Sequence, residues 1–422
     1  MADMAELVAQ QDESGEAALR EHDLTVPRIN IEAFCMTADF ASTMQTAAQD
    51  RRMAKAKTAV GMGGCASAVK RYANIGTPNL IVVETLSNGF SMFQELEGLS
   101  EVCDEDTRVI VAGPSNDVTL YRELIRQGVC EYLVTPAAPL QVIEAIAGAY
   151  ADPASAPAGK TVAVYGVRGG VGASALCHNI GTLVARQSER ETILVDLDLE
   201  FGTVALDFNA DAKSSIADAL GDLAGLDDVK FKRLLHRHDA YLRLLPSPAS
   251  IRPRAKAGEE EVLGLLDVAR FCADFLVLDL PSQWSDGVRC ALRQADKVVL
   301  VAAPDLASLR NLKSVHDWIS AERKHDEAPR IVLNGVGEPK RPEIAAAEFA
   351  EIIGAPVDLS MSYEPALFGA AQTDGKALVD LATARRLVEK LEDFTAHLIG
   401  LAEKSPKKTS ALSSLLSFAK KR

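Results

Sequence analysis

Aromatic residues are scarce in this sequence, and basic residues are outnumbered by acidic ones, 45 to 59. Phenylalanine, tryptophan and tyrosine make up 5% of the chain, and the formal net charge is −14. Single-stranded nucleic acid is bound by stacking bases on aromatic side chains, and duplex DNA through many lysine and arginine contacts to phosphate. We therefore do not expect nucleic acid to be a partner, although a local basic patch could still bind it.

Paired cysteines and long apolar runs are also lacking. The seven cysteines are scattered without a CxxC spacing, which favours buried thiols in a reducing cytosol. No run of 18 or more apolar residues predicts a spanning helix, and no apolar core near the N-terminus predicts a signal peptide. We expect a cytoplasmic protein whose membrane contact, if it has one, is peripheral.

The sequence predicts an α/β fold with two doubly wound, mainly parallel sheets. Apolar β-branched runs alternate with helical segments over 28–150 and again over 160–403, a pattern typical of sheets covered on both faces. Proline and small residues over 151–159 indicate a linker. Residues 1–27 are polar and acidic and predict a disordered arm, and 404–422 form a basic amphipathic tail.

The strands are expected at the apolar runs, most of which end in a polar or turn residue or are followed by one. In chain order these runs are Ile29–Met36, Leu80–Val83, Arg108–Gly113, Glu131–Pro136, Thr161–Tyr165, Thr192–Asp196, Phe275–Asp279, Lys297–Val301 and Arg330–Asn334. Ligands in open α/β sheets bind at the carboxyl ends of the strands. Between the first two runs lies the basic stretch Arg51–Lys57, for which a solvated helix face is the favoured interpretation.

A glycine-rich loop joins the first strand of the second domain to its first helix. Residues Arg168–Ser174 read RGGVGAS. Glycines let the backbone approach a phosphate closely, and the amides at a helix N-terminus bind it. A phosphate loop of the usual kind has a lysine before its Ser or Thr, and here that position is Ala173. We expect backbone contacts to a nucleotide from Gly169, Gly170, Val171, Gly172, Ala173, Ser174 and Ala175; a glycine-rich turn without a ligand is the alternative.

This loop resembles the deviant phosphate loop of the MinD/ParA family of ATPases. That family has a second, signature lysine just before the two glycines, and Arg168 occupies its position, while Val167 replaces the preceding glycine. In the family the signature residue reaches the partner's nucleotide across an ATP-sandwiched dimer. The resemblance therefore implies a homodimer and a phosphate contact for Arg168; an exposed loop arginine is the alternative.

Further polar residues match the family's site in order and spacing. By resemblance, Asp198 orients the attacking water, Asp196 lies near the metal, Asp279 holds Mg²⁺ through water, and Asn334 reads adenine. The Ser174 hydroxyl is expected on Mg²⁺. Each has a plainer alternative, in which the side chain only caps a turn or a helix.

The missing lysine decides the expected chemistry. A cation aimed at the charge that develops on the phosphates supplies several kcal/mol of transition-state stabilisation. Backbone amides and Mg²⁺ retain part of the ground-state binding. We therefore expect ATP and Mg²⁺ as cofactors, with weak hydrolysis at best.

The first domain resembles a response-regulator receiver domain without its site. Glu84 stands where the phosphorylated aspartate would be, Cys35–Thr37 where the acidic pair would be, and Thr135–Pro136 where Lys-Pro would be. The groups that bind Mg²⁺ and hold the phosphoryl group are thus missing. The resemblance implies a pseudo-receiver domain kept for docking rather than for phosphoryl transfer.

The basic tail has an apolar stripe formed by Leu412, Leu415, Leu416 and Ala419. Such a segment suits an anionic membrane surface or a partner's groove. MinD-like proteins use a similar C-terminal helix, which supports a peripheral contact with the inner membrane through 405–422; a disordered basic tail is the alternative.

A receiver-like domain fused to a MinD/ParA-like domain with this loop resembles the CpaE/TadZ family, over residues 28–400. The resemblance implies a pilus assembly factor of the Flp/Tad system. Such a factor acts at the cell pole by dimerising and by docking to the secretion machinery and polar factors. The rival interpretations are an active partition- or MinD-type ATPase that cycles on membrane or DNA, and a signalling protein with a phosphorylated receiver.

Overall fold

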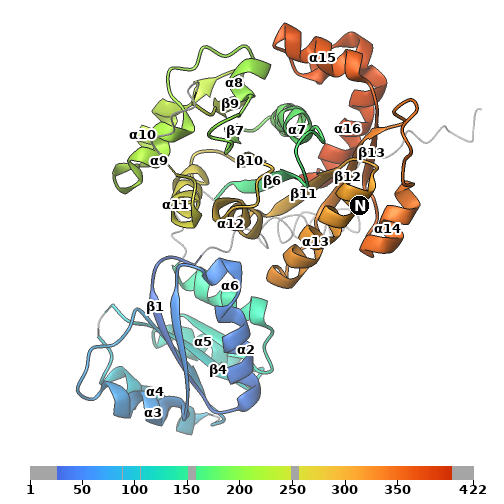
Figure 1. The fold of residues 1–422 in the computed structure, drawn as a ribbon. Helices are drawn as coiled ribbons and strands as arrows, with labels where there is room; N and C mark the ends of the chain where they lie inside the picture. Colours follow the sequence, from blue (N-terminus) through green and yellow to red (C-terminus); the bar gives the residue numbers. More distant parts are fainter. Residues whose placement is uncertain (1–25, 88, 105, 151–157, 249–255, 402–422) are drawn as a thin grey trace, which may run out of the picture. The chain divides into compact units, whose positions relative to one another are not determined.

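The chain divides into two compact units, residues 1–157 and residues 158–422. The computed structural model describes residues 26–87, 89–104, 106–150, 158–248 and 256–401. Nearly all of the predicted arm and linker and the whole predicted tail lie outside these ranges and stay predictions. Each unit contains one mainly parallel sheet between layers of helices, as the sequence predicts (Figure 1).

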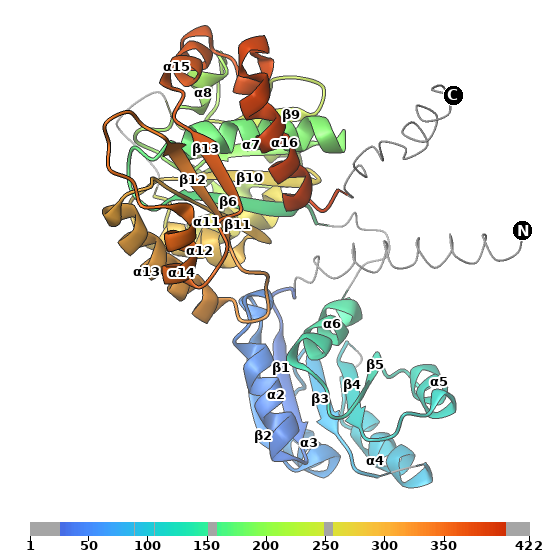
Figure 2. The same ribbon diagram turned by 90° about the vertical axis from the view of Figure 1, so that its right-hand side faces the viewer.

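The first unit has a five-stranded parallel sheet in the order β2-β1-β3-β4-β5, a doubly wound arrangement. Its strands are β1 (Asn30–Cys35), β2 (Lys57–Met62), β3 (Leu80–Glu84), β4 (Arg108–Gly113) and β5 (Glu131–Val134). Its helices are α2 (Ala38–Ala48), α3 (Gly64–Tyr72), α4 (Phe90–Ser100), α5 (Val118–Arg126) and α6 (Pro139–Tyr150). The apolar cores on the two faces place α2 and α6 on one side, and α3, α4 and α5 on the other (Figure 2).

The interpretation of Arg51–Lys57 as a solvated helix face is wrong. Arg51–Met53 is one 3₁₀ turn in which both arginines are buried, and Arg52 pairs with Asp50 at 2.9 Å. Lys57 begins β2, an edge strand whose side chains are exposed or half-buried. Because this strand packs little apolar surface, its composition lacks the continuous apolar run that revealed the other strands.

The second unit has an eight-stranded sheet in the order β13-β12-β11-β6-β10-β7-β9-β8, parallel except for the short β8. Its strands are β6 (Lys160–Gly166), β7 (Thr192–Asp196), β8 (His236–Arg237), β9 (Leu242–Leu245), β10 (Phe275–Leu280), β11 (Lys297–Ala302), β12 (Arg330–Val336) and β13 (Leu359–Ser362). The five predicted strands agree with the structure within two residues. The sequence did not reveal β8, β9 and β13, which are two to four residues long.

Helices cover both faces of the second sheet, and they are α7 (Ala173–Ser188), α8 (Val204–Asp207), α9 (Ile216–Gly221), α10 (Asp228–Leu234), α11 (Glu259–Ala269), α12 (Asp286–Gln294), α13 (Leu306–Glu322), α14 (Ala346–Ile353), α15 (Pro365–Asp374) and α16 (Arg385–Leu398). α7 and α16 pack on one face, and α11, α12 and α13 on the other (Figure 2). The central strand β6 lies between β10 and β11, so the loop after it emerges at the middle of the sheet's carboxyl edge.

The cysteines were expected to be buried thiols, and most of them are. All seven cysteines are free thiols; five are buried, whereas Cys103 and Cys130 are half-buried. Within the described ranges, none of the helices combines the length and apolarity that crossing a bilayer requires.

Candidate nucleotide site

The glycine-rich loop of the second unit ends in the N-terminus of α7. Gly170 and Gly172 both have φ +79°, a backbone conformation that favours glycine. A Cβ on Gly172 would lie 2.4 Å from the Asn334 side-chain nitrogen, so this position also needs glycine for space. The first amides of α7 have no intrahelical acceptor. The loop therefore presents backbone donors and a positive helix end, which together suit an anion.

A cavity of ≈ 180 Å³ opens beside this loop. Asn334 lines it from β12, and its side-chain nitrogen donates to the carbonyl of Val171 at 2.9 Å. Its side-chain oxygen accepts no hydrogen bond within the described residues. That oxygen can accept a hydrogen bond from a ligand, and the adenine-reading role suggested by resemblance stays a prediction.

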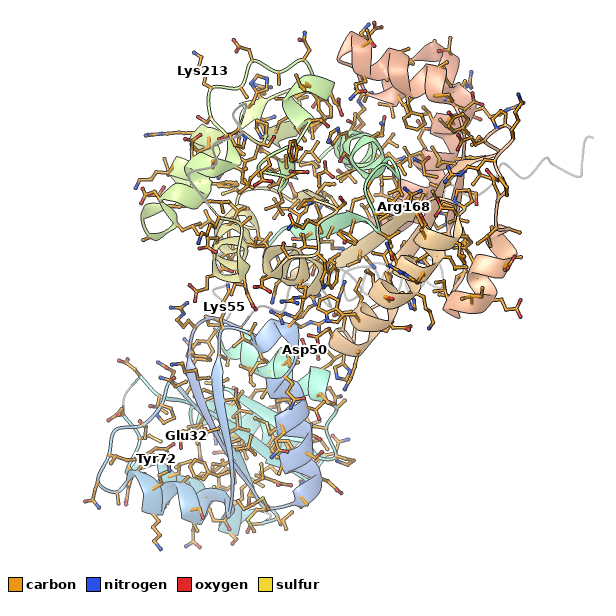
Figure 3. All side chains as sticks on the ribbon, viewed as in Figure 1. Glu32, Asp50, Lys55, Tyr72, Arg168 and Lys213 are labelled. Atoms are coloured by element: carbon orange, nitrogen blue, oxygen red, sulfur yellow. The ribbon has the colours of Figure 1, made fainter. Side chains whose placement is uncertain are left out.

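Arg168 (labelled in Figure 3) lies at the edge of this cavity but is held within its own unit. Its guanidinium pairs with Asp305 at 2.5 Å and donates to Ser308 Oγ at 3.0 Å. Partial burial acts to raise the pKa of Asp305, but the amide of Ser308 and the guanidinium outweigh it and lower that pKa. Arg168 is thus not the exposed loop arginine of the alternative interpretation. In this arrangement its guanidinium contacts residues of its own chain and does not extend toward a partner.

Asp279, at the end of β10, belongs to a buried charge cluster that the sequence reasoning missed. His178, one turn after Ser174 on α7, contacts Asp279 Oδ2 at 3.2 Å and Asp207 Oδ2 at 2.8 Å. Burial alone would lower the pKa of His178, but hydrogen bonds to Asp207 and Asp279 raise it to about 10. The imidazole is therefore a protonated cation between two carboxylates.

Asp196 and Asp198 serve the turn after β7. Asp196 accepts from the amide of Asp198 through Oδ1 and from that of Val204 through Oδ2. Asp198 in turn accepts from the amides of Glu200 and Phe201. Both oxygens of Asp196 are engaged with backbone, and burial, with the nearby Asp279 charge, raises its pKa to about 7. In this arrangement Asp196 and Asp198 cap the turn after β7, which is the plainer of the two interpretations of these residues.

The remaining side chains, Ser174 and Asp279, fit a magnesium ion whose other ligands are water and phosphate oxygens. Asp279 Oδ1 is buried and lacks a hydrogen-bond partner, which is the position a metal-bound water would fill. The Ser174 hydroxyl also makes no hydrogen bond within the described residues. Mg²⁺ usually takes few protein ligands, so one hydroxyl and one carboxylate are a sufficient contribution from the protein. Ser174 and Asp279 are thus the better candidates, and Asp196 the weaker one.

In the first unit, Glu84 fills the place where a receiver would be phosphorylated. It is 1% exposed, and its Oε2 accepts from the amides of Met36 and Thr37 at 2.6 and 2.8 Å. Its Oε1 accepts from the Thr37 hydroxyl at 2.7 Å. The carboxylate occupies the space between the two strand ends, and burial together with this charge raises the pKa of the neighbouring Cys35 to about 12.

Replacing Glu84 by glutamine is expected to destabilise the first unit by about 1–3 kcal/mol, because hydrogen bonds to a charged acceptor are stronger than those to a neutral one. Glutamine keeps the size and one acceptor oxygen. Denaturation followed by far-UV circular dichroism measures the loss. Glu144→Gln, at an exposed position of α6, is the matched control, and equal stability of the two variants would contradict the assignment.

A family model matches part of the second unit. Residues 159–318 match the family described as cellulose biosynthesis protein BcsQ. The septum site-determining protein MinD of Bacillus subtilis is 25% identical over 180 residues, which is 42% of this chain and 65% of MinD. The chain thus spans less than two thirds of the length of that curated relative.

Solved structures resemble different shares of the chain. A pilus assembly protein CpaE from Caulobacter crescentus CB15 is 48% identical over 30% of this chain and 98% of its own, with a TM-score of 0.30. A ParA family ATPase from Chlorobium tepidum is 21% identical over 57% of this chain and 100% of its own, with a TM-score of 0.52. A MinD from Pyrococcus horikoshii in complex with Mg-ADP is 17% identical over 59% and 99%, with a TM-score of 0.50. The last two establish a MinD/ParA-like fold.

Proposed function

This chain belongs to the CpaE family, and on that premise we propose that it binds ATP with Mg²⁺, dimerises, and helps to place a Flp/Tad-type pilus assembly system at the cell pole. The loop of the second unit carries the proposal. It combines glycines, helix amides and Arg168 around a cavity, and Ala173 stands in place of the lysine that drives hydrolysis. Such a site favours binding over turnover.

Exposed apolar side chains support dimerisation through the same edge. Among the described residues, the three most exposed large apolar side chains are Phe201, Leu206 and Leu306, at 71%, 71% and 73%. They follow β7 and β11, so they lie on segments leaving the carboxyl edge of the sheet, where the loop lies. Exposed apolar groups around a site are typical of a protein interface.

Glu84 supports a docking role for the first unit. Its carboxylate already uses the backbone donors between β1 and β3, and the usual acidic pair and lysine are missing. We propose that this unit is a pseudo-receiver that contacts pilus or polar factors without accepting a phosphoryl group.

Nucleotide-linked dimerisation is tested by the molar mass of the full chain in light scattering. With saturating ATP and Mg²⁺ we expect the mass of a dimer, and with no nucleotide a monomer. Arg168→Ala is expected to prevent the change, because we propose that Arg168 leaves Asp305 and Ser308 in the dimer and reaches the partner's nucleotide. Arg385→Ala, at an 86% exposed side chain on α16, is the control. An unchanged mass at saturating ATP would remove the dimerisation step from the proposal.

A further inference from the structure

Two arginines share one carboxylate oxygen beside the glycine-rich loop. Arg168 Nη2 and Arg341 Nη2 each lie 2.5 Å from Asp305 Oδ2. The side chains are partly shielded, with exposed fractions of 33% for each arginine and 20% for Asp305. Arg341 is remote from the loop in sequence, and the segment after β12 brings it there. Two cations on one acceptor leave guanidinium donors available for another anion.

The other contacts of this cluster are also accounted for. Asp305 Oδ1 accepts from the amide of Ser308 at 2.8 Å and thereby caps α13. Arg341 also donates to Glu338 Oε2 at 2.7 Å. The helix cap and the arginine contacts therefore use different oxygens of Asp305, so the arginines can leave without uncapping the helix.

Arg168 and Arg341 both line the cavity at the loop. The same cavity is lined by Glu338 and Glu364, whose charges repel a polyphosphate. The loop itself contributes no lysine, because Ala173 occupies that position. A polyphosphate that binds here needs cations to offset these carboxylates, and a guanidinium is suited to bidentate contact with phosphate.

We propose that Arg341 is a phosphate-binding residue of this site, and that Asp305 is the anion from which its guanidinium is transferred when a nucleotide binds. The ligand class is a nucleoside polyphosphate, which presents more negative charge than the single carboxylate it replaces. This assignment rests on the proposed function, since it requires that the cavity bind a nucleotide.

Calorimetric titration of the full chain with ATP and, separately, with AMP tests the assignment. Arg341→Ala is expected to weaken ATP binding about tenfold or more, the usual effect of losing a charge-assisted hydrogen bond. AMP binding is expected to change much less, because AMP lacks the β- and γ-phosphates. Asp305→Asn is expected to strengthen ATP binding, because it keeps the helix cap and removes the competing charge.

The control is Arg330→Ala. Arg330 begins β12, at the opposite end of the strand from the cavity, and forms comparable ion pairs with Glu327 and Asp358 at 3.2 Å. Circular dichroism checks that every variant is folded. If Arg341→Ala cannot be studied because it unfolds, the gain expected from Asp305→Asn still decides the matter.

The possible results distinguish failure of the proposed function, nucleotide binding, from failure of the role assigned to Arg341. Wild-type protein that binds no ATP would overturn the proposed function and this assignment with it. Wild-type binding with Arg341→Ala equal to Arg330→Ala would overturn the assignment alone. Equal weakening of ATP and AMP would also overturn the assignment to the polyphosphate, because Arg341 would then act on the part that both share, the nucleoside and the α-phosphate. Unchanged or weaker ATP binding by Asp305→Asn would refute the exchange of anions.

Discussion

Replacing His178 by leucine is expected to lower the free energy of unfolding of the second unit by about 3–5 kcal/mol, the usual cost of removing one partner from a buried ion pair. The imidazole is 3% exposed and holds Asp279 and Asp207 from two elements, β10 and α8. Leucine fills a similar volume but leaves both carboxylates without their cation. The loss is thus electrostatic rather than a loss of packing.

Urea unfolding followed by tryptophan fluorescence measures this effect. Trp284 and Trp318, the two tryptophans of the chain, both lie in the second unit with ring centroids 5.1 Å apart. His316→Leu is the matched control, because both ring nitrogens of His316 are buried without a hydrogen bond and its one carboxylate contact is to the exposed Asp317, at 3.8 Å. A His178 variant as stable as the His316 variant would show that the cluster contributes little.

The pH dependence of wild-type stability tests the contribution of His178 and its two aspartates independently. The pKa of His178 is raised to about 10 in the folded protein, from about 6.5 when unfolded. A raised pKa stabilises the fold fully below pH 6.5, and this contribution is lost as pH rises through 10. The second unit is therefore expected to lose stability over that interval, and His178→Leu is expected to show a shallower decline.

Replacing Ala173 by lysine is expected to raise the rate of ATP hydrolysis at least tenfold, because one cation aimed at the transferring phosphate is worth several kcal/mol in the transition state. Ala173 is the first residue of α7 and is half-buried. Side chains on a helix lean toward its N-terminus, so the ammonium group would extend over the loop. Phosphate release under saturating ATP is the measurement.

The control for this gain is Ala347→Lys, the same substitution at an exposed position of α14. It adds the same charge far along the chain from the loop and is expected to leave the rate unchanged. If Ala173→Lys hydrolyses ATP no faster than the parent, the missing lysine is not what limits turnover, and the positions of Asp196 and Asp198 become the better explanation.

The strands that place the site could be predicted because they are buried on both faces. β3, β7, β10 and β11 contain continuous apolar runs bounded by polar or turn residues. The loop after β6 could be located because clustered glycines destabilise a helix or a strand and therefore indicate a loop. β2 and β13 were missed because an edge strand packs on few neighbours and needs no continuous apolar run.

The charge clusters around the site could not be predicted for a different reason. His178 lies within a helix whose neighbouring residues are all buried, so its sequence context is that of an ordinary core histidine. Its partners Asp207 and Asp279 are 29 and 101 residues away. Arg341 and Asp305 are similarly remote from the loop and lie in polar connecting segments. Only the tertiary fold brings these charges together, since no sequence spacing links the partners.

Binding of ATP to the full chain is the most direct test of the central claim, that main-chain amides, two arginines and a magnesium ion retain a nucleotide without the usual lysine. Isothermal titration with ATP in the presence of Mg²⁺ is predicted to show saturable binding of one nucleotide per chain, weakened when Mg²⁺ is chelated. Absence of saturable binding at millimolar ATP would contradict the account, and the second unit would then keep the fold of a MinD/ParA-like ATPase without its ligand.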